Sequence, residues 1–471
     1  MFLAPETGGL LGGTRRMSIA TGSAVSEQSI AARLERLPFS RFQLTITLVL
    51  GVAIFFDSFD SLAVAYVLPV LIRDWHIPPQ SIGSLIGIAN LGQAVGALFF
   101  GWLAERIGRV PTARITIAIY AIMSLACAFA QNYDQLFWLR FVEGIGLGGE
   151  IPVASAYIAE MLRAEKRGTA FIGYQIIFPL GFTACAFAGA WIVPRFGWQW
   201  MFIIGVIPAV IALCLRSFCP ESPRWLASKG RLDEADAVVT KIERIASRNG
   251  TVALPPVPAL VIRPESGKTR WQELFEGRYR ARTFVVWGIW AAVYFINYGL
   301  QTWMPSLFSQ VYKLPLQQSL NYATITSVCG IVGPLLALCL IDRVGRRKWF
   351  IAALFLASAS LVLLWNEGAS TAEAVLIAFS FCFVWVSSLG LLLFLYTSEI
   401  YPTRMRAMGV SWASFWLRLA GAVGPLAVGY WLPVFGIAGV FLAFGIVAAV
   451  GCVIAFFMVE TKGRVLEEVS P

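Results

Sequence analysis

The chain has 471 residues, of which 58% are hydrophobic and only 14% are charged, and its mean hydropathy is +0.71. Soluble domains are about one-quarter charged, so these charges are too few to cover a water-exposed surface, and the composition excludes an ordinary soluble protein. The net charge of +10 does not indicate nucleic-acid binding, because the basic residues cluster in short loops between apolar segments. The eight cysteines are scattered and the one histidine is His76, so we expect no metal site, disulfide framework or cofactor.

The chain opens with a polar segment, residues 1–40, that is rich in Gly, Ser and Thr. It lacks the apolar core of a signal peptide, so we interpret it as a mobile cytoplasmic tail. Apolar segments of about 20 residues follow, which is the length that a membrane-spanning helix needs. Twelve such segments are predicted, with starts near Leu44, Ile82, Thr112, Leu136, Thr169, Trp198, Thr283, Asn321, Trp349, Ala372, Met408 and Ile437.

A long polar segment, residues 220–282, separates the sixth and seventh of these helices and contains a predicted amphipathic helix, Leu232–Ala246. We therefore predict an all-α membrane protein with twelve transmembrane helices in two pseudo-symmetric six-helix bundles, residues 41–219 and 283–459. The loops after the even-numbered helices carry most of the basic residues. By the positive-inside rule, both termini lie in the cytoplasm, including the short tail 460–471, and the chain is a multi-pass protein of the inner membrane.

The two predicted bundles repeat each other in sequence. An acidic-Arg-x-Gly-Arg motif follows the second helix at residues 105–109 and the eighth at residues 342–346. A glutamate with an arginine seven residues later ends the fourth helix, at 160 and 167, and the tenth, at 399 and 406. Both matches are separated by nearly the same length of chain, which indicates duplicated halves.

The repeated loops, the twelve helices and the long central segment resemble the major facilitator superfamily over about residues 41–464. Pro-Glu-Ser-Pro-Arg-Trp-Leu at 220–226 and Glu-Thr-Lys-Gly at 460–463 resemble sugar-porter motifs, with Val459 in place of a proline. The Gln-Gln-x-x-Gly-x-Asn pattern of the sugar porters' seventh helix is missing from residues 294–305.

A second resemblance is to the metabolite–proton symporter branch of the superfamily, which includes nicotinate and aromatic-acid permeases and synaptic vesicle glycoproteins. Asp-Ser-Phe-Asp at 57–60 is similar to the Asp-Gly-x-Asp motif of aromatic-acid symporters. The segments 146–154 and 401–407 are also similar to this branch. This resemblance implies a transporter with alternating access. The alternative of a membrane-embedded enzyme is disfavoured, because the sequence shows no nucleophile–base pair, metal cluster or nucleotide loop.

The resemblance to the superfamily also implies that charges at the helix ends form a cytoplasmic gate that latches the halves in the outward-facing state. The alternative is that these charges only set the orientation of the helices in the membrane. That alternative explains the arginines but not the acidic residues that accompany them, so we favour the gate. The predicted gate residues are Glu105, Arg106, Arg109, Glu160, Arg167, Asp342, Arg343, Arg346, Arg347, Glu399 and Arg406.

Charges inside the predicted helices are costly in a bilayer and usually serve transport. Asp57 and Asp60 are three residues apart on one helical face, and two such close carboxylates should not both ionise easily and should titrate as a pair. The resemblance implies that Arg140 pairs with Asp60 and releases it on protonation. Glu143 lies with Arg140 in the outer part of the predicted fourth helix and is included in this set. Proton coupling is the functional hypothesis for this set, and a permanent structural ion pair or hydrogen bond is the alternative. Glu150 is either a second protonation site or a hydrogen-bonded strut.

Arg418 lies near the centre of the predicted eleventh helix and is a candidate for binding an anionic group of a substrate. Alternatively, it neutralises an internal acid such as Glu150 or Asp57. Polar and aromatic residues at helical spacing are candidates to line the same cavity, although aromatic stripes also face lipid. Besides Arg418, the predicted substrate-binding residues are Tyr174, Gln175, Tyr294, Asn297, Tyr298, Gln301, Ser411 and Phe415.

Together these features predict a rocker-switch secondary transporter that imports a small organic acid with protons. The expected substrate is an aromatic or heteroaromatic carboxylate such as nicotinate or a benzoate. Alternatives are a proton-coupled sugar or polyol porter, an efflux transporter and a non-transporting solute sensor. The expected partners are the substrate, protons and the lipid bilayer, and a monomer suffices because both halves are complete.

Overall fold

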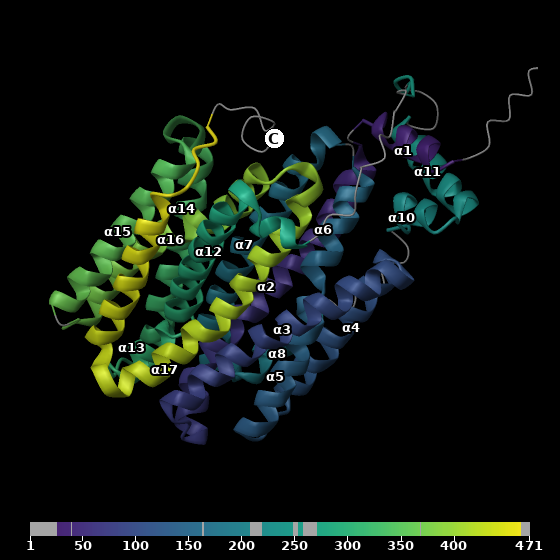
Figure 1. The fold of residues 1–471 in the computed structure, drawn as a ribbon. Coiled ribbons are helices and arrows are strands. Elements are labelled where there is room, and N and C mark those ends of the chain that lie inside the picture. The colour runs from purple at the N-terminus through teal and green to yellow at the C-terminus, as the bar shows by residue number, and fades with distance from the viewer. Residues whose placement is uncertain are drawn as a thin grey trace, which may run out of the picture.

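The computed structural model describes residues 26–38, 40–162, 164–207, 219–247, 253–257, 271–367 and 369–462, with side chains left undescribed at 159, 164–176, 403, 404 and 407. Within these ranges the secondary structure is helical (Figure 1). The elements are α1 (Glu27–Glu35), α2 (Arg41–Trp75), α3 (Pro79–Ile107), α4 (Arg109–Ala128), α5 (Tyr133–Gly148), α6 (Glu150–Met161), α7 (Ala164–Phe196), α8 (Gln199–Ile204), α10 (Pro223–Ser228), α11 (Leu232–Ala246), the 3₁₀ helix η1 (Trp271–Phe275), α12 (Gly277–Gln301), α13 (Met304–Gln310), α14 (Leu316–Val344), α15 (Arg346–Asn366), α16 (Ala372–Ile400) and α17 (Thr403–Ala455).

The predicted fold class is confirmed: in the described part, nine helices are long and apolar enough to cross a membrane. The remaining predicted spans are divided or merged. The fourth is interrupted at Gly149, between α5 and α6, and the sixth begins with α8 and continues outside the described residues. The last two spans are merged in α17 and separated by Gly436, whose φ of 65° and ψ of −178° suit only glycine.

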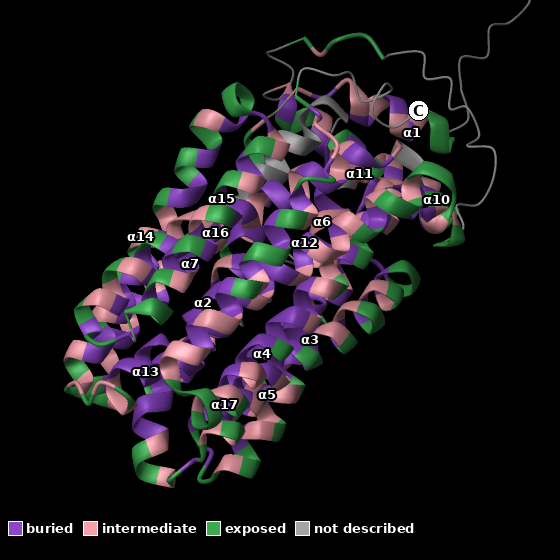
Figure 2. Cartoon of the chain, turned by 60° about the vertical axis from the view of Figure 1, so that its left-hand side comes forward, coloured by how far each residue is buried: buried purple, intermediate pink, exposed green. Residues whose placement is uncertain are grey.

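The helices pack in two groups, α2–α8 and α12–α17 (Figure 1). The groups meet mainly where α3 packs against α17 and α7 packs against α14. Large apolar side chains remain exposed on the outer faces, including Leu98 (74%), Ile377 (71%) and Phe457 (69%). Figure 2 shows exposed segments on the outside of the bundle and buried segments along its middle. An outer surface of this kind suits lipid and not water.

Glycines allow the close approach of α3 and α5. A Cβ added at Gly96 of α3 would overlap the carbonyl oxygen of Ile145, and one added at Gly148 of α5 would overlap the carbonyl oxygen of Gln93. Small residues at such crossings let the backbones of membrane helices touch. The glycine-rich stretch 144–149 therefore has a packing role that fixes where the charged residues of α5 and α6 lie.

Part of the N-terminal tail that we expected to be mobile is instead a helix packed against the central segment. Ile30 and Leu34 of α1 share a buried apolar cluster with Val239 and Ile242 of α11. Arg33 and Arg36 form ion pairs with Glu243, at 2.8 and 2.5 Å, and Arg33 also pairs with Asp236. The amphipathic helix predicted at Leu232–Ala246 is confirmed with the same bounds, and its two faces supply both kinds of contact.

We predict that Gly96→Ala destabilises the protein by about 1–3 kcal/mol, because the added methyl group must push α3 away from α5. The matched control is Gly101→Ala on the same helix, where an added Cβ meets nothing within 4 Å. Thermal unfolding of the detergent-purified variants measures both. Equal midpoints for the two variants would show that the α3–α5 contact is not tight.

We also predict that the contact between α1 and α11 is insensitive to pH from 5.5 to 7.5 and weakens only under stronger acid. Burial alone would raise the pKa of Glu243, but hydrogen bonds from Arg33 and Arg36 outweigh it and lower the pKa. Because the unfolded value is about 4.3, the stabilisation is fully present above it and is lost as the pH falls through the lower native value.

Distances between spin labels at the exposed positions Gln28 and Arg244 test this behaviour. Glu243→Gln should lengthen or broaden the distance at neutral pH. Glu234→Gln should not, because Glu234 pairs only with Arg231 of its own helical end. A distance that changes between pH 5.5 and 7.5 in the unsubstituted protein would contradict the prediction.

Candidate functional site

Two matching charge clusters lie at one end of the bundle, here called the basic end. In the first, Arg109 forms ion pairs with Glu160 at 2.6 Å and Glu105 at 2.7 Å. The Glu221 carboxylate accepts hydrogen bonds from the backbone N–H groups of Arg109 and Val110 at 3.1 and 3.2 Å. A carboxylate at this helix N-terminus satisfies free N–H groups and complements the helix dipole.

The second cluster repeats the first in the other group of helices. Arg346 forms ion pairs with Glu399 at 2.9 Å and Asp342 at 2.7 Å. Glu460 accepts hydrogen bonds from the backbone N–H groups of Arg346 and Arg347 at 2.9 and 3.2 Å. The sequence analysis missed the roles of Glu221 and Glu460. A signal was present, because each glutamate follows the last span of its half, in Pro-Glu-Ser-Pro and in Val-Glu-Thr-Lys.

The remaining predicted gate residues make other contacts. The Arg106 guanidinium lies 4.1 Å from the centre of the Trp102 ring, and the Arg343 carbonyl oxygen accepts a hydrogen bond from Lys462. The Arg167 side chain lies outside the described part. Between the described residues of the two helix groups, no hydrogen bond or ion pair joins the basic ends.

The two groups are joined instead through the middle and the opposite end of the bundle. Thr324 of α14 donates a hydrogen bond to the carbonyl oxygen of Ala186 at 3.1 Å and lies 3.3 Å from the Tyr66 hydroxyl. The Gln317 amide donates to the Ala190 carbonyl oxygen at 2.9 Å, and the Asn90 amide donates to the Gly421 carbonyl oxygen at 3.2 Å. The halves are therefore in contact at the end away from the charge clusters.

A tight buried set of charges surrounds Arg140. Its Nη1 lies 2.7 and 2.9 Å from the two carboxylate oxygens of Asp60 and 2.9 Å from Oε2 of Glu143. The Cys127 thiol donates to the same Glu143 oxygen at 3.4 Å. Each of the three charged residues is at most 2% exposed. One guanidinium thus faces two carboxylates in a water-poor interior.

A second buried set consists of Asp57, Glu150 and Arg418. Asp57 is 1% exposed and neither carboxylate oxygen has a hydrogen-bond partner among the described residues; Oε1 of Glu150 likewise has none. The charge of Arg418 acts on both carboxyl groups, but no described carboxylate lies within 4.0 Å of its guanidinium. This set is loose, and it spans the two helix groups.

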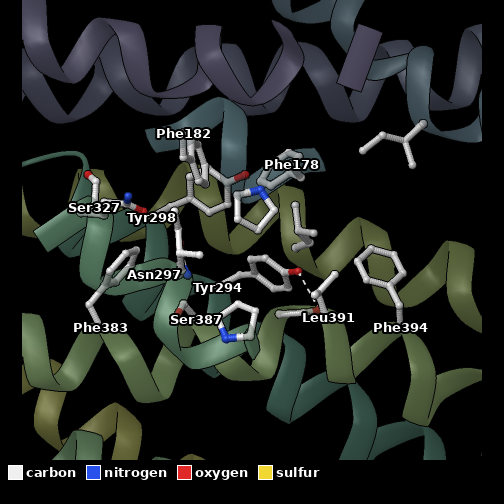
Figure 3. A pocket seen from close by; sticks show the side chains of 18 of the residues that line it. Phe178, Phe182, Tyr294, Asn297, Tyr298, Ser327, Phe383, Ser387, Leu391 and Phe394 are labelled. Carbon is white, nitrogen blue, oxygen red and sulfur yellow. Dashed lines mark hydrogen bonds between the residues drawn. The ribbon is translucent and has the colours of Figure 1, made fainter. Parts of the chain in front are cut away.

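A cavity lies between the two helix groups beside Arg418 (Figure 3). Its described lining includes the predicted residues Tyr294, Asn297, Tyr298 and Gln301 of α12. Phe178 and Phe182 of α7 complete an aromatic wall, and Figure 3 shows their rings close to Tyr298. Sequence reasoning missed the wall formed by α14 and α16. Residues at helical spacing, most of them small, signal that wall in hindsight: Ser327, Gly330 and Pro334 on α14, and Ser387, Gly390 and the larger Leu391 on α16.

Some predicted substrate-binding residues lie elsewhere. Ser411 and Phe415 of α17 are not among the cavity-lining residues. The Phe415 ring, 38% exposed, packs against Trp412 and Trp416. The side chains of Tyr174 and Gln175 lie outside the described part. The acids Asp57, Asp60, Glu143 and, from α6, Glu150 are also absent from the cavity wall, so proton-binding candidates and the cavity occupy separate places.

A polytopic helical bundle with a cavity between two matching halves, buried charges near it and charge clusters at one end is the architecture of a secondary transporter. A family model described as "Sugar (and other) transporter" matches residues 65–471. The chain belongs to this family of the major facilitator superfamily, and it is a multi-pass membrane transporter and not an enzyme.

The chain is also similar to individual transporters within this superfamily. The chain is 33% identical to the niacin transporter NiaP of Acinetobacter baylyi, covering 94% of this chain and 99% of the relative. It is 27% identical to the 4-hydroxybenzoate transporter PcaK of the same organism, covering 81% and 83%. Among solved structures, the partially occluded inward-open xylose transporter XylE of E. coli matches with a TM-score of 0.71 and 21% identity, covering 90% and 100%. This last similarity concerns the fold alone.

We predict that Arg140→Met destabilises the protein by about 3–5 kcal/mol, because two carboxylates then remain buried without a cation. Adding Asp60→Asn should recover a large part of this loss, since it removes one of the stranded charges. Thermal or denaturant unfolding of the single and double variants measures the recovery. A double variant as unstable as the single one would show that Asp60 is not ionised beside Arg140.

Proposed function

We propose that the chain is a proton-coupled symporter that imports a small aromatic or heteroaromatic monocarboxylate, with Arg418 binding the carboxylate. The observation that carries this proposal is a buried guanidinium beside a cavity, with no described carboxylate within 4.0 Å of it. A buried cation without a close counter-ion is costly. A substrate carboxylate would supply a bidentate partner and relieve that cost.

The cavity wall supports an aromatic substrate. Tyr294 and Tyr298 have ring centroids 6.1 Å apart and nearly parallel planes, 29° apart, and the Phe182 ring lies edge-on to Tyr298 at 6.4 Å. Flat rings of this kind enclose a flat ring better than a hydroxyl-covered sugar, which would leave its hydroxyl groups without partners. The names of the niacin and 4-hydroxybenzoate transporters support the same class of substrate.

An excess of buried carboxyl groups supports proton coupling. In the described interior away from the end clusters, four carboxyl groups accompany two guanidinium groups: Asp57, Asp60, Glu143 and Glu150, with Arg140 and Arg418. Unpaired charge is expensive in the membrane interior. Carboxyl groups in excess of cations therefore favour binding protons, and a substrate carboxylate at Arg418 increases the excess by one.

Competition for Arg418 provides the coupling step. With the cavity empty, the charge of Arg418 compensates Asp57 and Glu150 across the interface of the halves. A bound substrate carboxylate takes over the guanidinium, so one of these acids must take up a proton to remain buried. Substrate and proton then enter together, and for a monoanion with one proton no net charge crosses the membrane. Protonation of Asp60 likewise releases Arg140 and permits the halves to move.

The alternating motion follows from the two helix groups. Residues 41–219 and 283–459 move as units about the cavity, with 1–40, 220–282 and 460–471 in the cytoplasm at the basic end. Among the described residues the polar contacts between the halves lie away from that end, which supports an inward-facing state. In the outward-facing state the clusters around Arg109 and Arg346 come together as a gate, in which a network of weak pairs biases the equilibrium. A monomer is the proposed unit of transport.

We predict that nicotinate, benzoate or 4-hydroxybenzoate raises the unfolding temperature of the detergent-purified protein, more at pH 5.5 than at pH 7.5. The expected stabilisation is about 2.7 kcal/mol at 100 times the dissociation constant. Arg418→Ala should abolish it, because the carboxylate loses its partner. Arg195→Ala is the control, since Arg195 lies outside the cavity and its guanidinium donates only to the Trp191 carbonyl oxygen.

Uptake into proteoliposomes completes this test. An inward pH gradient should drive accumulation of the acid that binds, and Asp57→Asn should remove the dependence on the gradient. If hexoses, pentoses or polyols raise the unfolding temperature and none of the three carboxylates does, the result would contradict the proposal and favour a sugar or polyol porter. Tight binding without uptake would favour a solute sensor.

A further inference from the structure

Gln301 ends α12 and places a second buried polar group beside the cavity. Its side chain is 4% exposed, it lines the cavity, and Nε2 has no hydrogen-bond partner among the described residues. A buried amide nitrogen left without an acceptor costs about 1–3 kcal/mol. Such a group next to a cavity is therefore poised to donate to whatever occupies it.

The packing of α12 against α17 sets the distance between Gln301 and Arg418. Gly299 and Gly424 face each other, since a Cβ added at Gly424 would lie 3.1 Å from the Cα of Gly299. Trp303, four residues after Gly299, donates from its indole nitrogen to the carbonyl oxygen of Pro425, the residue after Gly424, at 3.0 Å. The register of the two helices is thus fixed at this level of the bundle.

Measured from the level of Gly299 and Gly424, Arg418 and Gln301 lie in opposite directions along the cavity. Arg418 is six residues before Gly424, towards the basic end, and Gln301 is two residues after Gly299, towards the other end. At 1.5 Å per residue, their backbones are about 12 Å apart along the helices. Part of this length is covered by the two side chains, and the remainder suits one aromatic ring with its carboxylate.

We propose that Gln301 is a specificity residue: its Nε2 donates to an acceptor on the substrate ring, remote from the carboxylate that Arg418 binds. This inference rests on the proposed function and deepens it. The substrate class becomes aromatic monocarboxylates that carry a ring nitrogen or a ring oxygen as an acceptor. An unsubstituted ring leaves the Gln301 amide unpaired and binds more weakly.

The aromatic wall explains why one amide can discriminate among such ligands. Tyr294, Tyr298 and Phe182 provide contact area that all planar acids share. That area contributes affinity and little selectivity. A site built to donate a hydrogen bond rejects an analogue that lacks the acceptor, because the donor is then buried without a partner. Selectivity among aromatic acids therefore depends on Gln301.

The test measures dissociation constants for nicotinate and benzoate, which have similar shape and differ in the ring nitrogen. We expect the unsubstituted protein to prefer nicotinate about tenfold, which corresponds to about 1.4 kcal/mol. Gln301→Met keeps the length of the side chain and removes the donor, so the two constants should come within about twofold through weaker nicotinate binding. Gln93→Met is the matched control, because Gln93 is a buried amide of α3 outside the described cavity lining.

The outcomes separate this inference from the proposed function. If both acids bind through Arg418 but Gln301→Met keeps the tenfold preference, or the unsubstituted protein shows no preference, the role of Gln301 is wrong and the symporter proposal stands. If neither acid binds, or binding survives Arg418→Ala, both proposals fail. Should Gln301→Met not fold, a ligand series on the unsubstituted protein decides: moving the nitrogen, in pyridine-2-carboxylate and pyridine-4-carboxylate, must change the affinity.

Discussion

The structure depends on one constraint, which is that among the described residues the buried carboxyl groups outnumber the buried cations. Away from the end clusters, the two buried guanidinium groups in the described part each accompany two acids: Arg140 has Asp60 and Glu143, and Arg418 has the more distant Asp57 and Glu150. Burial of an unpaired charge costs several kcal/mol, so neither set is balanced without a further positive charge. The two sets meet this constraint differently. The first is closed by short hydrogen bonds, whereas in the second neither oxygen of Asp57 has a partner among the described residues. Only the second set includes a residue of the cavity wall, Arg418.

The end clusters show the opposite arrangement, because Arg109 and Arg346 each pair closely with two acids. The duplicated halves form the same contacts. Gly108 and Gly345 adopt φ of 106° and 95° at equivalent turns, which brings the following helix N-termini onto the carboxylates of Glu221 and Glu460. Because these carboxylates come from the segments that follow the sixth and twelfth spans, each cluster ties three separate parts of its own half together. In the described part, the polar contacts between halves lie at the opposite end and in the middle of the bundle.

The sequence predicts the parts of this protein that depend on period and composition. Apolar segment length predicts the spans, and the amphipathic pattern predicts α11 to the residue. The stripe of Tyr294, Asn297 and Gln301 also reaches the cavity. What the sequence leaves open depends on contacts between distant segments. The stripe through Phe415 faces a tryptophan cluster because the rotation of α17 is set by its packing on α3 and α12. Likewise, α1 packs on α11 through a shared apolar cluster and through Glu243, which pairs with both Arg33 and Arg36.

Helix α2 connects the two charge sets, and this placement explains how events at the cavity reach the rest of the molecule. Asp57 and Asp60 lie one helical turn apart, so the first acts on Arg418 in the other half while the second holds Arg140 in its own half. A change of charge at Asp57 alters the attraction across the interface, whereas a change at Asp60 alters packing within one half. Because both acids are on a single rigid turn, a shift that relieves one must move the other. Under the proposed function, a ligand that draws Arg418 away from Asp57 acts on the interface of the halves directly, without requiring contact with the Arg140 set.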